Sequence, residues 1–203
     1  MIYTNPRPQE SNAGEYYPSG YSPFQYVYPD LLFPQDNSGA RKIKNWLKRA
    51  VLNIHYGYFG KSKKSGIMRI LTLPIKYNIG WIFPKYKENG RVLDIGCSTG
   101  VYLAKLRELG WDCYGVEISR KAADWGKNKL GLKIVTGTAE QVLFPEEYFD
   151  AVTMWHVLEH VYSPEKTIKE VYKVLRKGGV FIVGIPNAGS IERKFFGRWW
   201  GEW

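Results

Sequence analysis

Short apolar segments alternate with amphipathic segments along the chain from Arg91 onward. Five of the apolar segments have the length of buried strands, and they cover residues 91–97, 113–118, 133–137, 149–157 and 180–187. The segments between them carry apolar residues at helical spacing. Nearly continuous apolar strands that alternate with helices are typical of a parallel sheet with helices on both faces. The pattern therefore predicts an α/β fold with about five strands.

Serine and glycine residues mark the ends of the predicted helices. Gly110 ends a helix over residues 101–109, while Ser119 and Gly131 bound the next helix. A further helix is predicted to begin at Ser163-Pro164 and to stop at Gly178-Gly179. Its expected apolar face consists of Ile168, Val171, Tyr172 and Leu175.

The residues before this alternation form two parts. Residues 1–40 are rich in Pro, Tyr, Gly and Asn, and we expect an irregular arm that packs through its aromatic rings. Residues 41–90 are predicted to form a basic helical cap or lid. Its first helix, over residues 41–56, has an apolar face made of Ile43, Trp46, Leu47, Ala50, Val51 and Ile54, with Lys42, Lys44, Lys48 and Arg49 on its other faces. A second apolar stretch, residues 67–83, is interrupted at Pro74.

A glycine-rich turn, "VLDIGCSTG" from Val92 to Gly100, follows the first strand and indicates a nucleotide site. A phosphate-binding loop needs a Lys-Ser/Thr pair after its last glycine, and Val101-Tyr102 stands there instead. A dinucleotide site needs a second glycine where Cys97 and Ser98 follow Gly96, which disfavours an NAD(P)-dependent oxidoreductase.

Two acidic residues near this turn favour a nucleoside that carries an amino acid. Asp94 would repel a pyrophosphate but suits an ammonium group. Glu117 stands 21 residues after Gly96 at the end of the second strand, where its carboxylate can accept hydrogen bonds from both ribose hydroxyls.

Together these segments resemble the class I S-adenosylmethionine-dependent methyltransferases, which have a Rossmann-like sheet. The resemblance covers residues 91–187 and rests on "VLDIGCSTG", "YGVEIS", "GTAEQVLFPEEYFDAVTMWHVLEHV" and "VLRKGGVFIVGIPN". Within the family the chain most resembles a branch that modifies sugars and the cell envelope. The resemblance implies S-adenosylmethionine as cofactor and a small-molecule acceptor that is a sugar, lipid-linked or quinone-like.

The resemblance also implies roles for individual residues. Asp94, Gly96, Cys97, Ser98 and Gly100 would form the methionine pocket. Glu117 would hold the ribose and Ile118 would lie on the adenine, with Thr138 and Ala139 at the adenine edge. The family more often has Asp at the position of Thr138. Met154 and Trp155 would flank the sulfonium and the acceptor, although Trp155 could equally be a core aromatic.

"HVLEH" places three titratable side chains, His156, Glu159 and His160, at positions that share a face on a helix. It resembles the Glu-x-x-Glu-His element of ubiquinone-biosynthesis O-methyltransferases, which is associated with a divalent metal. We favour the alternative without a metal, in which these are loop and cap residues. His156 is then the candidate base that deprotonates an acceptor hydroxyl.

The family's full sheet has seven strands, and relatives often carry a cysteine-rich knuckle ahead of "YTNPRP". We therefore expect this chain to be the middle of a longer protein, with an exposed sheet edge that Phe195, Phe196, Trp199, Trp200 and Trp203 cover or enlarge. An alternative function is a catalytically incomplete module that binds S-adenosylmethionine or docks on a membrane.

The charge of the chain is concentrated in one segment. The net charge of +10 divides into −3 for residues 1–40, +12 for 41–91 and +1 for 92–203, which argues against a nucleic-acid groove across the domain. The helix over 41–56 either lies on an anionic membrane or covers the acceptor side of the sheet with its basic face in solvent. The two cysteines, Cys97 and Cys113, form no metal-ligand pattern, and the chain shows no secretion signal. We therefore expect a cytoplasmic location. If the helix over 41–56 lies on a membrane, the protein would be peripheral to the inner face of that membrane.

Overall fold

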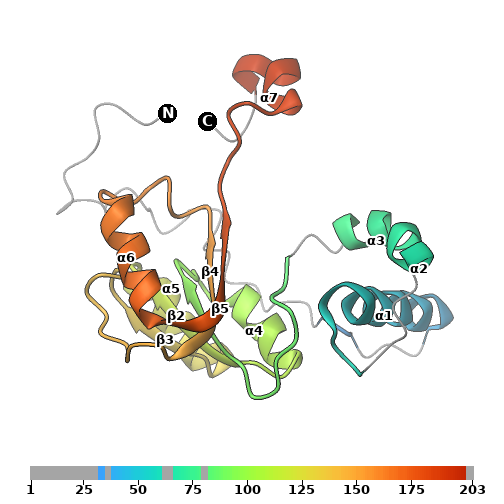
Figure 1. Cartoon of the computed structure of the whole chain (residues 1–203), viewed down its shortest axis with the longest axis horizontal. Coiled ribbons are helices and arrows are strands. Elements are labelled where there is room, and N and C mark those ends of the chain that lie inside the picture. Colours follow the sequence, from blue (N-terminus) through green and yellow to red (C-terminus); the bar gives the residue numbers. More distant parts are fainter. Residues whose placement is uncertain (1–31, 35–37, 61–65, 79–81, 200–203) are drawn as a thin grey trace.

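The fold was analysed in a computed structural model, which describes residues 32–34, 38–60, 66–78 and 82–199 (Figure 1). Most of the predicted arm at 1–40 lies outside these residues. Within them, Leu32 is buried, and its backbone N–H donates to both carboxylate oxygens of Glu108 at 3.0 and 3.1 Å.

The centre of the protein is a five-stranded parallel sheet, as the alternation predicted. The strands are β1 (Arg91–Ile95), β2 (Asp112–Glu117), β3 (Lys133–Thr136), β4 (Phe149–Trp155) and β5 (Leu175–Gly184), in the order β3-β2-β1-β4-β5. The order reverses between β1 and β4, and ligands of open α/β sheets bind outside the carboxyl ends of the strands at such a point.

Helices cover both faces of the sheet. On one face α4 (Val101–Glu108) and α5 (Arg120–Leu130) pack on Val92, Cys113 and Ala151. On the other face α6 (Pro164–Val174) packs on Leu93 and Val152. Neighbouring strand residues point to opposite faces, so the central strands β1 and β4 contribute apolar residues to both cores.

The predicted ends of α5 are confirmed. The Ser119 hydroxyl accepts the backbone N–H of Ala122 at the start of the helix. Gly131 ends it with a left-handed φ of +61°, a conformation that glycine adopts without steric cost. α4 likewise ends just before Gly110, close to the predicted boundary.

The prediction for the end of α6 was wrong. The helix stops at Val174, and Gly178-Gly179 lie in an irregularity of β5 in which Leu175 pairs with Phe149 and Val180 with Ala151. The β4–β5 register shifts between these pairs, and in this stretch the Arg176 guanidinium donates to the buried Asp150 carboxylate. The buried face of α6 consists of Thr167, Val171 and Val174, whereas Ile168 and Tyr172 are exposed.

The cap comprises four helical elements: α1 (Gly39–Val51), a π-helical turn η3 (Leu52–Tyr56), α2 (Gly66–Leu71) and α3 (Leu73–Asn78). Its attachment to the sheet domain lies just after η3. The buried Tyr58 hydroxyl donates to the Pro84 carbonyl at 2.8 Å and accepts the Trp111 indole N–H at 2.7 Å. Figure 1 shows α1, α2 and α3 at the opposite end of the molecule from α6. Of the helix predicted over residues 41–56, only the η3 end packs on the sheet domain, through Leu52 and Tyr56, while α1 itself contacts mainly η3 and α3.

After β5 the chain leaves the sheet and forms α7 (Ile191–Phe196) and a short 3-10 turn, η4 (Gly197–Trp199), away from it (Figure 1). Phe195 and Trp199 are exposed there and do not cover the β5 edge, while Trp200 and Trp203 lie outside the described residues. Among the described helices, none is long and apolar enough to cross a membrane.

Gly126 tests the packing of α5 on the sheet. A Cβ at this position would lie 2.8 Å from the Thr99 carbonyl oxygen and 2.5 Å from the Ile134 Cδ1 atom. Overpacking against backbone outweighs the gain of about 1 kcal/mol in helix propensity. We expect Gly126→Ala to lower the free energy of unfolding by about 1–3 kcal/mol in urea titrations. Gly39→Ala, at the first residue of α1 where a Cβ meets nothing within 4 Å, is the matched control and should not lower the free energy of unfolding.

Candidate cofactor site

The glycine-rich turn lies at the carboxyl end of β1, where the strand order reverses. The backbone N–H groups of Gly96 and Cys97 both donate to the Val116 carbonyl, at 2.8 and 3.1 Å. Gly96, Ser98 and Gly100 all have positive φ angles, which bend the chain sharply into α4. These bonds hold the turn against the end of β2.

Glu117 joins this turn to the next helix. One of its carboxylate oxygens accepts the Ser98 N–H and the other accepts the Ser119 N–H, both at 2.8 Å. The side chain is 5% exposed, and burial raises the pKa of the carboxyl, opposed by these hydrogen bonds. Each oxygen keeps a lone pair for a further donor, as a ribose with two hydroxyls requires.

Asp94 is a second buried carboxylate beside the turn. Burial, together with the negative charge of Glu117, raises its pKa to about 7, while a hydrogen bond from the Thr153 hydroxyl at 2.6 Å acts in the opposite direction. Among the residues that the structure describes, no lysine or arginine pairs with Asp94 or Glu117. A site with two buried acids and no cation of its own suits a positively charged ligand.

Thr153 is a site residue that the sequence analysis missed. It is fully buried on β4 and lies opposite Asp94 in the β1–β4 register. The available signal was its hydroxyl in the apolar run "AVTMW", because a buried hydroxyl needs a partner.

Two residues predicted for the cofactor pocket turn their side chains into the core instead. Cys97 is buried, and a Cβ on the neighbouring Gly115 would lie 2.5 Å from its sulfur. Met154 has no exposed surface and packs in the core under α6. The burial of Met154 follows from the alternation of side chains along β4, because its neighbours Thr153 and Trp155 occupy the face toward Asp94.

The predicted adenine residues lie at the surface next to this site. Ile118 is 44% exposed directly after Glu117, so its side chain is available to a flat ligand. The Thr138 N–H donates to the Gln141 side chain at 3.1 Å, and Ala139 packs at the edge of the core.

Trp155 is half-buried at the carboxyl end of β4. Its ring stands edge-on to Tyr102, with centroids 5.7 Å apart, and a Cβ on Gly184 would lie 2.6 Å from the ring. Tyr102 in turn stacks on Phe83 at 5.9 Å. Trp155 therefore packs on the core, and its place at the strand end leaves the predicted contact with the sulfonium and the acceptor a prediction.

His156 follows with a φ of +54°, a strained conformation for a residue other than glycine. Its N–H donates to the Gly184 carbonyl at 2.9 Å, and its exposed ring has Nδ1 3.7 Å from a Glu159 carboxylate oxygen.

The metal hypothesis for His156, Glu159 and His160 is not supported. The segment forms turns rather than the helix that would align the three side chains, because the positive φ of His156 interrupts regular structure. Over the described ranges no three His, Cys, Asp or Glu side chains are grouped to hold a metal ion.

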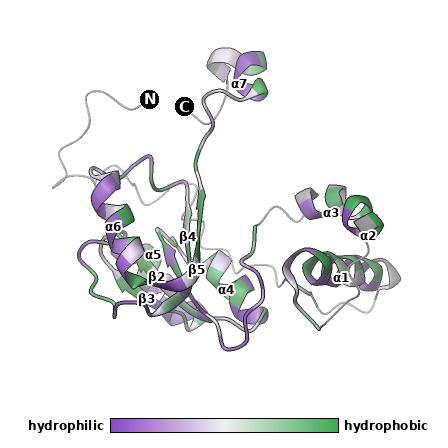
Figure 2. Ribbon diagram, viewed as in Figure 1, coloured by the Kyte–Doolittle hydropathy of each residue, from purple (hydrophilic) through white to green (hydrophobic). Residues whose placement is uncertain are grey.

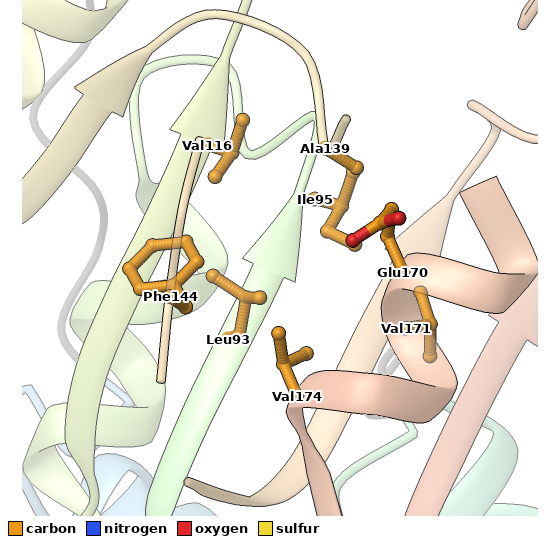
Figure 3. Close-up of a pocket in the computed structure, with 8 residues that line it drawn as sticks. All are labelled: Leu93, Ile95, Val116, Ala139, Phe144, Glu170, Val171 and Val174. Carbon is orange, nitrogen blue, oxygen red and sulfur yellow. The ribbon is translucent and has the colours of Figure 1, made fainter. Parts of the chain in front are cut away.

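A small apolar pocket lies elsewhere, between the sheet and α6 (Figure 3). Figure 3 shows Leu93, Val116 and Phe144 on one side of it and Val171 and Val174 of α6 on the other. It contains neither buried acid of the turn, so we assign it to core packing rather than to the cofactor.

Comparison with known proteins identifies the family. A family model described as a methyltransferase domain matches residues 73–202, which is more than half of the chain. The chain belongs to the class I S-adenosylmethionine-dependent methyltransferases. This assignment agrees with the glycine turn, the acid at the end of β2 and the parallel sheet, and it excludes the alternative of an NAD(P)-dependent oxidoreductase.

Several methyltransferases are similar to part of the chain. The sterol 4-C-methyltransferase strm-1 of Caenorhabditis elegans is 32% identical over 47% of this chain and 31% of its own length. The ubiquinone/menaquinone biosynthesis C-methyltransferase UbiE of Vibrio campbellii is 31% identical over 46% of this chain and 40% of its own. A solved S-adenosylmethionine-dependent methyltransferase from Thermotoga maritima is 33% identical, covers 55% of this chain and 52% of its own, and has a TM-score of 0.47.

An uncharacterized protein of Methanocaldococcus jannaschii is 32% identical over 66% of this chain and 49% of its own length. The chain of this methyltransferase thus spans about half, or less, of the curated relatives that it matches.

The raised pKa of Asp94 predicts a pH-dependent stability. A carboxyl whose pKa rises from 3.8 unfolded to about 7 folded stabilises the fold at low pH and loses that contribution as the pH rises toward 7. Asp94→Asn removes this loss. The free energy of unfolding of the variant minus that of the wild type should therefore be about 1–4 kcal/mol larger at pH 8 than at pH 4. Urea unfolding of both proteins at each pH measures the difference. Equal pH slopes in the two proteins would contradict a buried, titrating Asp94.

Proposed function

We propose that this methyltransferase binds S-adenosylmethionine at the glycine turn between β1 and β2 and methylates a small-molecule acceptor. The observation that carries the proposal is the pair of buried carboxylates, Asp94 and Glu117, at neighbouring strand ends. The cofactor offers a matching pair of groups, an ammonium and a ribose diol.

In this proposal each acid has one task. Glu117 keeps its two backbone hydrogen bonds and accepts the ribose hydroxyls with its remaining lone pairs. Asp94 faces the ammonium directly or through a water, while the Thr153 hydroxyl fixes the carboxylate orientation. Ile118 covers the adenine, and the turn from Gly96 to Gly100 lets the backbone approach the methionine part.

The reacting end of the site lies at the carboxyl end of β4. The bound cofactor supplies an activated methyl group, and alignment of the acceptor nucleophile with it is the main requirement. Trp155, held by Tyr102 and by the bare Gly184 backbone, forms a fixed wall for that alignment. His156, next to it and exposed, is the proposed base for the acceptor proton.

Relatives support an acceptor with a large apolar part. The names of the similar proteins state that they methylate quinone precursors and sterols. We therefore rank a quinone-like or lipid-linked acceptor above a free sugar. The alternative is a unit that binds the cofactor without transferring methyl groups. Such a unit would bind S-adenosylhomocysteine but show no methyl transfer in the assays described next.

Calorimetric titration with S-adenosylhomocysteine tests the cofactor site. We expect micromolar binding by the wild type and a loss of about 100-fold or more for Glu117→Ala, because two charge-assisted hydrogen bonds disappear. Glu146→Gln, at an exposed acid in the loop before β4, is the control and should bind like the wild type. Because Glu117 also holds backbone, circular dichroism must show that the variant is folded. Unchanged affinity in a folded Glu117→Ala would refute the proposed site.

His156→Asn tests the proposed base. Asparagine tolerates the positive φ of this position, so the backbone is kept while the imidazole is lost. With methyl-labelled S-adenosylmethionine and a demethylated quinone in its reduced quinol form, whose hydroxyl His156 would deprotonate, we expect methyl transfer to fall by about 10²- to 10⁴-fold at unchanged affinity for S-adenosylhomocysteine. A full rate in the variant would exclude His156 as the base. Cofactor binding by the wild type without transfer would favour the non-catalytic alternative.

A further inference from the structure

The cap helices expose large apolar side chains. On α1, Ile43 and Trp46 are 62% and 64% exposed, and on α2 Ile67, Ile70 and Leu71 are 64–70% exposed. α2 and α3 pack against the η3 turn and α1, so these side chains belong to one helical unit. Figure 2 shows hydrophobic ribbon in this unit at the end of the molecule away from α6.

Among the described residues of this unit, the buried apolar side chains lie at its end next to η3. In η3, Leu52, Ile54 and Tyr56 are buried. In α1 the buried residue is Val51 at the end of the helix, whereas Ile43 and Trp46, more than one turn before it, are exposed. Large exposed apolar side chains on an amphipathic helix indicate a surface that contacts a partner.

The charge around these side chains has one sign. The described residues 38–60 and 66–78 contain seven basic residues and no Asp or Glu: Arg41, Lys42, Lys44, Lys48, Arg49, Arg69 and Lys76. At about 100° per residue, Lys42 and Lys44 lie on the two flanks of Ile43. Both lysines are exposed, so their long side chains can lie beside the apolar stripe with their ammonium groups at its borders.

We propose that α1, α2 and α3 form a docking surface for an anionic phospholipid bilayer. Exposed Ile, Leu and Trp side chains would enter the interface between headgroups and acyl chains, and the flanking ammonium groups would pair with lipid phosphates. The contact is peripheral and lies along the membrane plane. It does not depend on the methyltransferase activity, and it would bring the site to lipid-dissolved acceptors.

Two other occupants fit the observations less well. A nucleic acid would use the basic groups but would leave the apolar side chains in water, since phosphate contacts come from Lys and Arg. A second copy of the chain docking by the same face would place the exposed lysines Lys42 and Lys44 of two caps against one another, and the described residues of the cap contain no acid to compensate them. An anionic bilayer matches both the charge and the apolar side chains.

Vesicle co-sedimentation of the full chain tests the proposal. The probes are vesicles of phosphatidylcholine alone and of phosphatidylcholine with about one third phosphatidylglycerol. We expect binding to the anionic vesicles at least 10-fold stronger than to the neutral ones, and a loss of that preference at about 0.5 M salt. No binding to either kind of vesicle would overturn the proposal, and so would equal binding to both.

Paired variants separate the two contributions. Trp46→Glu should weaken binding to anionic vesicles by more than about 10-fold, whereas Tyr172→Glu on α6, where Tyr172 is 82% exposed, should leave it unchanged. The double variant Lys42→Glu/Lys44→Glu should weaken binding to anionic vesicles by about 20-fold or more. The control Lys129→Glu/Lys177→Glu changes the net charge by the same amount away from the cap and should have no effect. All six substituted positions are exposed, so the fold is kept.

Three further results would also overturn the proposal. One is vesicle binding that Trp46→Glu leaves intact. Another is heparin binding that competes with vesicles and needs only the lysines, which would indicate a polyanion partner. The last is a concentration-dependent mass in light scattering that Trp46→Glu abolishes, which would indicate a second copy. Methyl transfer is not a readout here, so failure of this proposal and failure of the proposed function are distinguishable.

Discussion

The two hydrogen bonds that the Glu117 carboxylate accepts from Ser98 and Ser119 hold the site together. They join the glycine turn after β1 to the start of α5 across the end of β2. The same turn is held by the Val116 carbonyl and kept close to its neighbours by the missing side chains of Gly96 and Gly100. One acid thus fixes the backbone of the turn and offers its remaining lone pairs to a ligand.

This arrangement costs stability in the empty protein. Asp94 and Glu117 are both buried, burial raises the pKa of each, and their charges repel one another. Uncharged residues would fill the same space at lower cost. Buried acids that destabilise the fold are typical of binding sites, where a ligand of opposite charge supplies the missing compensation.

A chain of aromatic contacts connects the cap with the carboxyl end of β4. Tyr56 meets Phe83 at 6.1 Å, Phe83 stacks on Tyr102 at 5.9 Å, and Tyr102 meets Trp155 at 5.7 Å. The cap is therefore packed, through η3, onto the wall of the proposed acceptor region. A membrane contact made by α1 would fix the orientation of that wall relative to the lipid surface.

The sequence by itself determined the parallel sheet, the ends of α5 and the two acids, because alternation, capping residues and the spacing from Gly96 to Glu117 are local properties. Only the tertiary structure decided which face each strand residue takes. It placed Met154 and Cys97 in the core, paired Thr153 with Asp94, and put Gly178-Gly179 in a register shift of β5 where Arg176 meets Asp150. It also left Ile43 and Trp46 uncovered. Periodicity identifies an apolar face, but burial depends on how far the neighbouring elements reach along it.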